Sequence, residues 1–338
     1  MRCRRHGLPT AAAAALAVLA VVAILTAPGR AQAPVTLDDL AAAVVRIKAH
    51  IDPDGRTVPN LGLEREGSGV VIGSDGLILT IGYLMVEAHA AEVATNDGRT
   101  VAAEVVGYDH ETGFGLLKAQ APLGLRPMAL GKSAGLAEKD PALVVSFGGP
   151  GMVAPVRVAA RREFAGSWEY LLEDAIFTSP PHPAWSGAAL INREGRLVGI
   201  GSLIVADTSG KGEGGPGNMF VPIDRLAPIL ADLIAEGRSS APPRPWLGLT
   251  TEEAAGRLVV ARVAAGGPAE KAGVAKGDVV VGVGGETASG LADFYRKVWA
   301  LGAAGTVVPL DLLRGEAPRR VEVPSANRLD HLKLKSTF

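Results

Sequence analysis

The sequence predicts a mainly β protein with two units, a strand-rich unit followed by a smaller α/β unit. The first observation is length, because 338 residues exceed what one typical domain holds. The second is composition: 48% of the residues are hydrophobic, and 43 glycines with 23 prolines suit short strands joined by tight turns. The third is a change from a two-residue period to helical spacing near residue 223.

The strand-rich unit begins with AVVRIKAHI, residues 43–51, which largely alternates apolar and polar residues as a half-buried strand does. Three hairpins are predicted further along, each folded about a short turn that ends in glycine. These turns are Ser74-Asp75-Gly76, Asn96-Asp97-Gly98 and Arg193-Glu194-Gly195. Many short strands with few helices predict a sandwich or a barrel.

A helix and a linker separate the two units. The helix is indicated by apolar residues at helical spacing, namely Leu226, Ile229, Leu230, Leu233 and Ile234. Gly237 is placed to end it. The Ser/Pro-rich stretch RSSAPPRP, residues 238–245, cannot form regular helix or ladder hydrogen bonds and is predicted to be a linker.

The second unit has the pattern of a small α/β module. Its strands are predicted at Leu258–Val263, Asp278–Val283, and around Val307–Leu313 and Arg320–Val323. Its helices are predicted near Pro268–Ala272 and around Leu291–Trp299, where Leu291, Phe294 and Val298 share one face.

The first 33 residues have the pattern of an export signal. Arg2, Arg4 and Arg5 form a basic start, an apolar run covers 11–27, and Ala31-Gln32-Ala33 offers a small-x-small cleavage site. We expect a cleaved signal peptide; the alternative is an uncleaved membrane anchor, since the run is near the lower limit for spanning a bilayer.

Charge and cysteine usage exclude several classes of site. Removing residues 1–33 takes away four arginines and no acidic residues, which gives a formal net charge of −5 and argues against nucleic-acid binding. The single cysteine, Cys3, lies inside the signal, so the mature chain offers no thiolate ligand and no disulfide. No paired histidine spacing appears, and we expect neither a metal nor another cofactor.

Five segments, in order along the chain, resemble the HtrA family of exported trypsin-like serine proteases that carry a C-terminal PDZ domain. They are GSGVVIGSDGLILT (67–80), VVGYDHETGFGLLKA (105–119), VPIDRLAPILADLIAEG (221–237), PWLGL (245–249) and GGPAEKAGVAKGDVVVGVGG (266–285). The resemblance implies a trypsin-like pair of six-stranded Greek-key β-barrels followed by a small α/β PDZ domain.

The expected domains are a signal peptide at 1–33, a trypsin-like domain at 34–237, a linker at 238–245, a PDZ domain at 246–325 and a C-terminal tail at 326–338.

In this family a serine, a histidine and an aspartate lie between the two barrels. The serine attacks the peptide carbonyl, the histidine takes its proton, and the aspartate orients the imidazolium.

The resemblance puts a tyrosine at the family's histidine position. The family histidine follows three residues after the threonine that closes the first hairpin, and here Thr80 leads to Tyr83. A phenol with an ordinary pKa of about 10 is a poor general base near neutral pH. We therefore expect Tyr83 to fill the space of an imidazole without replacing its chemistry.

By the same resemblance the aspartate position is Gly113, which has no side chain to offer. Asp109 and Glu111 lie nearby, but strand alternation and a turn displace them from that position. Both are expected to be solvated loop carboxylates.

The serine is retained as Ser186, within PAWSGAAL, residues 183–190. The family loop has the pattern G-N-S-G-G-P-L, whose first glycine supplies an N–H of the oxyanion hole. Here Ala184 takes the place of that glycine and Trp185 that of the asparagine, and the Gly-Pro pair after Ser186-Gly187 is missing. None of the histidines is expected to serve as a base, including His182, which lies four residues before the serine, and His110.

The PDZ match implies a peptide-binding role. Trp246, Leu247, Gly248 and Leu249 correspond to the loop whose N–H groups capture a peptide C-terminal carboxylate. The alternative is a PDZ fold used for packing alone.

The sequence thus predicts an exported, periplasmic pseudoprotease that binds peptides, protein C-termini or unfolded envelope proteins in protein quality control. The alternative is an active serine endopeptidase that uses Ser186 with a non-standard base. The resemblance implies a homo-oligomer, a trimer formed through an aromatic N-terminal segment, but PVTLDDLAAAVVRIKAH contains no aromatic residue.

Overall fold

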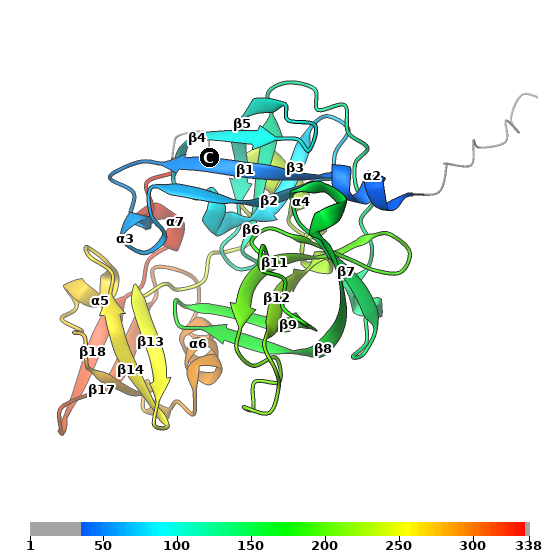
Figure 1. Ribbon diagram of the computed structural model, residues 1–338. Coiled ribbons are helices and arrows are strands. Elements are labelled where there is room, and N and C mark those ends of the chain that lie inside the picture. Colours follow the sequence, from blue (N-terminus) through cyan, green and yellow to red (C-terminus); the bar gives the residue numbers. More distant parts are fainter. Residues whose placement is uncertain (1–34, 335–338) are drawn as a thin grey trace, which may run out of the picture. The chain divides into compact units, whose positions relative to one another are not determined.

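The computed structural model describes residues 35–334 and shows the mainly β architecture that the sequence predicts (Figure 1). The predicted signal at 1–33, with Cys3, lies outside these residues. From Leu37 onward the chain packs as one compact unit, which begins with helix α2 (Leu37–Ala42). No helix within residues 35–334 is long and apolar enough to cross a membrane.

The first barrel is closed by six antiparallel strands in the order β1-β2-β3-β6-β5-β4. Its strands are β1 (Val44–Ile51), β2 (Glu64–Val71), β3 (Leu77–Ile81), β4 (Ala88–Ala94), β5 (Thr100–Tyr108) and β6 (Phe114–Ala119). A short helix, α3 (Val58–Leu61), lies in the β1–β2 connection, and a 3₁₀ turn, η1 (Gly82–Leu84), follows β3. The alternating burial of β1 agrees with the period-two pattern of its sequence.

The second barrel is closed by six strands in the order β10-β11-β12-β9-β8-β7. Its strands are β7 (Pro141–Val145), β8 (Val153–Gly166), β9 (Tyr170–Ser179), β10 (Ala189–Ile191), β11 (Leu197–Val205) and β12 (Gly217–Pro222). Two 3₁₀ turns, η2 (Ser133–Gly135) and η3 (Gly149–Met152), flank β7. The three hairpins expected from the sequence therefore all form, as β2–β3, β4–β5 and β10–β11.

The C-terminal unit is a sheet in the order β13-β14-β15-β17-β18, with β16 paired to β15. Figure 1 labels β13, β14, β17 and β18 of this sheet. Its elements are β13 (Leu249–Ala254), β14 (Arg257–Val263), α5 (Pro268–Lys271), β15 (Val279–Val283), β16 (Glu286–Thr287), α6 (Leu291–Ala300), β17 (Val307–Arg314) and β18 (Ala317–Pro324). The buried face of α6 includes Leu291, Phe294 and Val298, as its helical spacing predicts.

The helix that leaves the second barrel is shorter than its sequence pattern predicts. A 3₁₀ turn, η4 (Ile223–Arg225), comes first, and the α-helix α4 covers only Leu230–Glu236. Gly237 ends it in the left-handed conformation at φ 70°, with its N–H donated to the carbonyl of Leu233.

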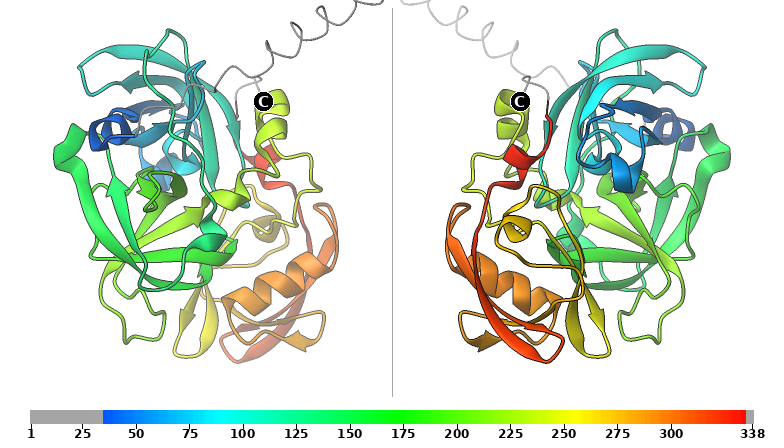
Figure 2. Two further views of the ribbon diagram at one scale, coloured as in Figure 1. Left: turned by 90° about the vertical axis from the view of Figure 1, so that its right-hand side faces the viewer. Right: turned by 90° about the vertical axis from the view of Figure 1, so that its left-hand side faces the viewer.

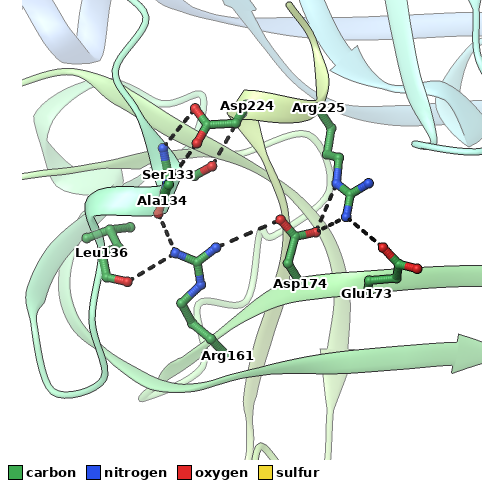
Figure 3. Close-up of polar contacts among 8 residues, drawn as sticks. All are labelled: Ser133, Ala134, Leu136, Arg161, Glu173, Asp174, Asp224 and Arg225. Carbon is green, nitrogen blue, oxygen red and sulfur yellow. Dashed lines mark hydrogen bonds and ion pairs between the residues drawn. The ribbon is translucent and has the colours of Figure 1, made fainter. Parts of the chain in front are cut away.

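Strands β8 and β9 form a long hairpin that the sequence does not predict, and hydrogen bonds and ion pairs tie it to the rest of the second barrel. Arg161 of β8 bonds the carbonyl oxygens of Ser133 and Leu136 and lies 3.9 Å from Asp174 of β9. Asp174 also accepts two bonds from Arg225, at 2.8 and 3.0 Å (Figure 3). These contacts hold the part of the hairpin that lies below its tip at residues 166–170.

Residues 326–334 run from the C-terminal unit to the first barrel (Figure 2). Helix α7 (Arg328–His331) lies in this segment, and Leu329, Leu332 and Leu334 pack against the core of the first barrel. The N–H of Lys333 donates to Glu87 Oε1 at 2.8 Å. The predicted linker is also held, because Arg244 pairs with Glu111 at 3.1 Å.

Candidate active site

Ser186 lies in the loop between β9 and β10, where it faces the first barrel. Its carbonyl oxygen accepts the N–H of Ser68 on β2 at 2.8 Å. Gly187 has φ 71°, and a Cβ there would lie 1.9 Å from the carbonyl oxygen of Ser68. Glycine at 187 therefore permits the close approach of the two barrels that brings Ser186 to the side chains after β3.

Tyr83 is one of those side chains. Its Oη lies 2.8 Å from Ser186 Oγ and 2.9 Å from the carbonyl oxygen of Ser202 on β11. A carbonyl oxygen can only accept a hydrogen bond, so Tyr83 donates its single phenolic proton to the carbonyl oxygen of Ser202. The Ser186 hydroxyl then donates to the phenol oxygen. The sequence-predicted serine and tyrosine are thus brought together.

The environment of Tyr83 makes its phenol less acidic. Burial raises its pKa to about 12, although the hydrogen bond with Ser186 acts in the opposite direction. A phenol that stays protonated at neutral pH has no lone-pair basicity comparable to imidazole. It can position the Ser186 hydroxyl but is poorly suited to remove its proton.

Gly113 lies close to this pair through the backbone. Its carbonyl oxygen accepts the N–H of Gly82, the residue before Tyr83, at 2.7 Å. Gly113 has φ 83°, a left-handed conformation that favours glycine. No carboxylate comes from this position, so nothing there can orient a base at residue 83.

The expectation that Asp109 is solvated is wrong. Its side chain is buried, and its Oδ2 accepts the N–H and the hydroxyl of Thr112 at 2.8 and 2.7 Å. Asp109 therefore closes the turn that precedes β6, as aspartate commonly does in such turns. Glu111 is half-buried in its pair with Arg244.

The N–H at the oxyanion-hole position is used within its own loop. Ala184 donates its N–H to His182 Nδ1 at 3.1 Å, and its carbonyl oxygen accepts the hydroxyl of Ser146 at 2.5 Å. This arrangement directs the Ala184 N–H to the buried His182 ring, whereas an oxyanion hole needs that N–H directed at the substrate.

Neither nearby histidine serves Ser186 among the contacts seen. His182 bonds Ala184 and Asn218 and lies 3.4 Å from Ser146, and burial lowers its pKa. His110 is partly buried, with Nε2 2.8 Å from Arg328 Nη1. Its pKa is well below the ordinary value because of burial and then the charge of Arg328.

The loop expected to capture a carboxylate already holds one from within the chain. The backbone N–H groups of Leu247, Gly248 and Leu249 donate to the carboxylate of Glu169 at 2.8, 2.7 and 2.7 Å. Trp246, the first residue of the predicted loop, does not contact this carboxylate through its backbone N–H. It exchanges two backbone hydrogen bonds with Ala326. Glu169 lies at the tip of the β8–β9 hairpin and is buried.

Glu169 is the residue at this loop that the sequence does not reveal. It lies in a segment, 166–170, whose turn carries no Asn-Gly or Asp-Gly signal, so neither the hairpin nor its reach is apparent. No cluster of three or more His, Cys, Asp or Glu side chains that could hold a metal ion occurs within residues 35–334.

Two family descriptions match the chain. A trypsin-like peptidase domain matches residues 67–200, and a PDZ domain matches residues 245–324. The first match extends across both barrels and includes Tyr83, Gly113 and Ser186. The second coincides with the C-terminal unit, which is therefore a PDZ domain.

Individual proteins agree with these matches. HhoA of Synechocystis sp. is 30% identical over 306 residues, which cover 80% of this chain and 74% of HhoA. The periplasmic pH-dependent serine endoprotease DegQ of Escherichia coli is 31% identical over 288 residues, which cover 80% of this chain and 61% of DegQ. The solved structure of the HtrA-type protease AlgW with a decapeptide matches with a TM-score of 0.51 and 24% sequence identity. The match covers 87% of this chain and 99% of the AlgW chain, and it shows a similar fold.

Proposed function

This chain belongs to the HtrA-like family of trypsin-like serine proteases with a PDZ domain, and from that premise we propose that it is an exported pseudoprotease. In this role it binds peptides or unfolded segments without cleaving them. The observation that carries the proposal is the contact between Ser186 Oγ and Tyr83 Oη at 2.8 Å. A protonated phenol lies where an activated serine needs a base.

Two further features support loss of catalysis. The lack of a side chain at Gly113 leaves residue 83 without an orienting carboxylate, and the N–H of Ala184 is bonded to His182. Removing triad members costs several orders of magnitude in rate, and what then remains depends largely on the oxyanion hole. With the base, the orienter and one oxyanion donor all altered, little catalysis is expected.

The PDZ domain supports the binding half of the proposal. Its ligands would be peptides or protein C-termini, and unfolded envelope proteins are the partners that a role in quality control implies. DegQ is named as a periplasmic enzyme, which supports export of this chain to the periplasm. A homo-oligomer, by family resemblance a trimer, is part of the same proposal.

The decisive experiment is incubation of the mature protein with casein beside a Ser186→Ala variant. We expect equal background cleavage from both. Cleavage that disappears in the variant would overturn the proposal and favour an active endopeptidase with a non-standard base. Fluorescence anisotropy with unfolded casein tests the binding half, and saturable binding by both proteins is the expected result.

A further inference from the structure

The tip of the β8–β9 hairpin occupies the peptide site of the PDZ domain as a bound peptide would. The carboxylate of Glu169 accepts the three consecutive N–H groups of Leu247, Gly248 and Leu249. Three charge-assisted bonds from one loop are what a PDZ domain offers to a peptide C-terminus. Here the acceptor is a side chain from the second barrel.

The backbone of the tip is bonded on each side of the groove. The N–H of Thr251 on β13 donates to the carbonyl oxygen of Ser167 at 2.9 Å, which is the bond of an added strand. From helix α6, Tyr295 Oη donates to the carbonyl oxygen of Gly166 at 2.7 Å and accepts the N–H of Glu169 at 3.2 Å. Both walls of the groove therefore contact the hairpin.

An apolar side chain accompanies the carboxylate. Leu171, two residues after Glu169 on β9, is buried within the core cluster of the PDZ domain, which contains Leu247, Leu249 and Tyr295. Its burial removes apolar surface from water in the way that the terminal side chain of a bound peptide would. The internal ligand thus presents both a carboxylate and an aliphatic group.

Glu169 has a backbone conformation that usually belongs to glycine. Gly166 pairs with Tyr170, so the loop has three residues, and its last one, Glu169, has φ 59°. Glycine is the residue usually found at this left-handed position of a three-residue hairpin loop. A glutamate there accepts backbone strain while its carboxylate gains the three N–H bonds.

We infer that Glu169 is an internal ligand of the PDZ domain, and that an external peptide with a free C-terminal carboxylate and an aliphatic end binds by displacing the hairpin tip. The inference rests on the proposed peptide-binding function. The external peptide then competes with Glu169 for the same N–H groups. Its binding releases the tip of the β8–β9 hairpin, and strand β9 leads to the loop that carries Ser186.

The test compares peptide affinity in the full mature chain and in Glu169→Gly. Glycine suits φ 59°, so this variant removes the carboxylate while it relieves the hairpin. The probe is a fluorescent peptide ending in leucine, as the free acid and as the amide. We expect the acid to bind the variant about tenfold or more tightly than the wild type, and the amide to bind both weakly.

Glu173→Ala is the matched control, because Glu173 lies on the same hairpin but pairs with Arg225 at 3.5 Å. It should bind the acid peptide as the wild type does. Equal affinity of the acid peptide for wild type and Glu169→Gly would overturn the inference but leave peptide binding intact. Failure of the acid to bind even Glu169→Gly would overturn both the inference and the proposed role of the PDZ domain.

Amide hydrogen exchange provides a readout that does not depend on the peptide chosen. The N–H groups of residues 247–249 should be protected in the wild type and should exchange faster in Glu169→Gly. In Glu169→Gln the amide oxygen can still accept, but the NH₂ replaces the second oxygen and faces a donor, so protection should fall in part. Unchanged protection in both variants would contradict the assignment of Glu169 as the ligand of this loop.

Discussion

Tyr83 Oη is 2.8 Å from Ser186 Oγ, across the contact between the two barrels. The same phenol also reaches the carbonyl oxygen of Ser202 on β11 at 2.9 Å. One side chain of the first barrel therefore bonds two segments of the second. In this arrangement the residue in the position of a catalytic base contributes cohesion between the barrels.

Replacing Tyr83 by phenylalanine should lower the stability of the protein without creating activity. The change leaves the carbonyl oxygen of Ser202 and the hydroxyl of Ser186 without their shared partner, at a cost of about 1–2 kcal/mol in the free energy of unfolding. Ser186→Ala removes only one of the two contacts and should cost less. Urea unfolding of both variants measures the difference, and equal costs would argue that the bond to Ser202 contributes nothing.

Restoring the triad alone should restore little proteolysis. In Tyr83→His with Gly113→Asp, a Cβ at 113 would lie 3.4 Å from Ile81 Cδ1, so the aspartate fits, with strain of roughly 1 kcal/mol from φ 83°. The Ala184 N–H is still bonded to His182. Adding Ala184→Gly lets this peptide unit turn, and we expect about a hundredfold more casein cleavage, because one oxyanion donor is worth roughly that factor.

The same combinations carrying Ser186→Ala are the controls for this series and should remain at background. High activity of the double variant without Ala184→Gly would show that the N–H of Ala184 is not limiting. High activity of Tyr83→His alone would mean that a carboxylate other than residue 113 orients the histidine.

Alkaline unfolding should be coupled to the tyrosines. The chain has four, and burial raises the pKa of each above 10.0, to about 12 for Tyr83 and Tyr108, and upward also for Tyr170 and Tyr295. A raised folded-state pKa favours the protonated phenol, so this contribution to stability is complete below about pH 10 and is lost as the pH rises through the folded values. Phenolate absorbance should therefore appear together with the loss of circular dichroism. Gradual ionisation before unfolding would contradict this.

The pKa of His110 should rise when Arg328 is replaced by glutamine. Burial is the largest cause of its low pKa and the Arg328 charge the next, so the rise should be partial. Because the folded-state pKa is depressed, stability from this group is present above about pH 6.5 and is lost as the pH falls, and the variant should lose less. Histidine resonances followed by NMR measure the shift. Arg320→Gln, which removes a pair with Asp311, is the control.

Much of the fold follows from local patterns. The turns at 74–76, 96–98 and 193–195 each specify a hairpin, because glycine in a left-handed conformation ends a short loop wherever the rest of the chain lies. The helix at 226–234 is predicted too long because its apolar spacing begins at Leu226, whereas residues 226–229 form turns between η4 and α4; the cap at Gly237 is a local effect and is correct.

The site shows where sequence patterns stop being informative. The resemblance along the chain assigns Tyr83 and Ser186 to the histidine and serine positions, and the fold brings the two side chains into contact. The bond from Ala184 to His182 depends on a peptide orientation that no residue type specifies. Glu169 and Leu247 are 78 residues apart, and their bond depends on the length of a hairpin and the docking of a domain. Such tertiary pairings have no local signature.

The attachment of Glu169 to the same chain as its binding loop sets a threshold for recognition. Its effective concentration near the loop is fixed by the hairpin and does not fall when the protein is diluted. An external C-terminus gains access only in proportion to the fraction of molecules whose groove is vacant, so its apparent dissociation constant exceeds the intrinsic one. Scarce C-termini would leave the protein unchanged, and abundant ones would saturate it. One glutamate thereby determines the detection limit of the domain.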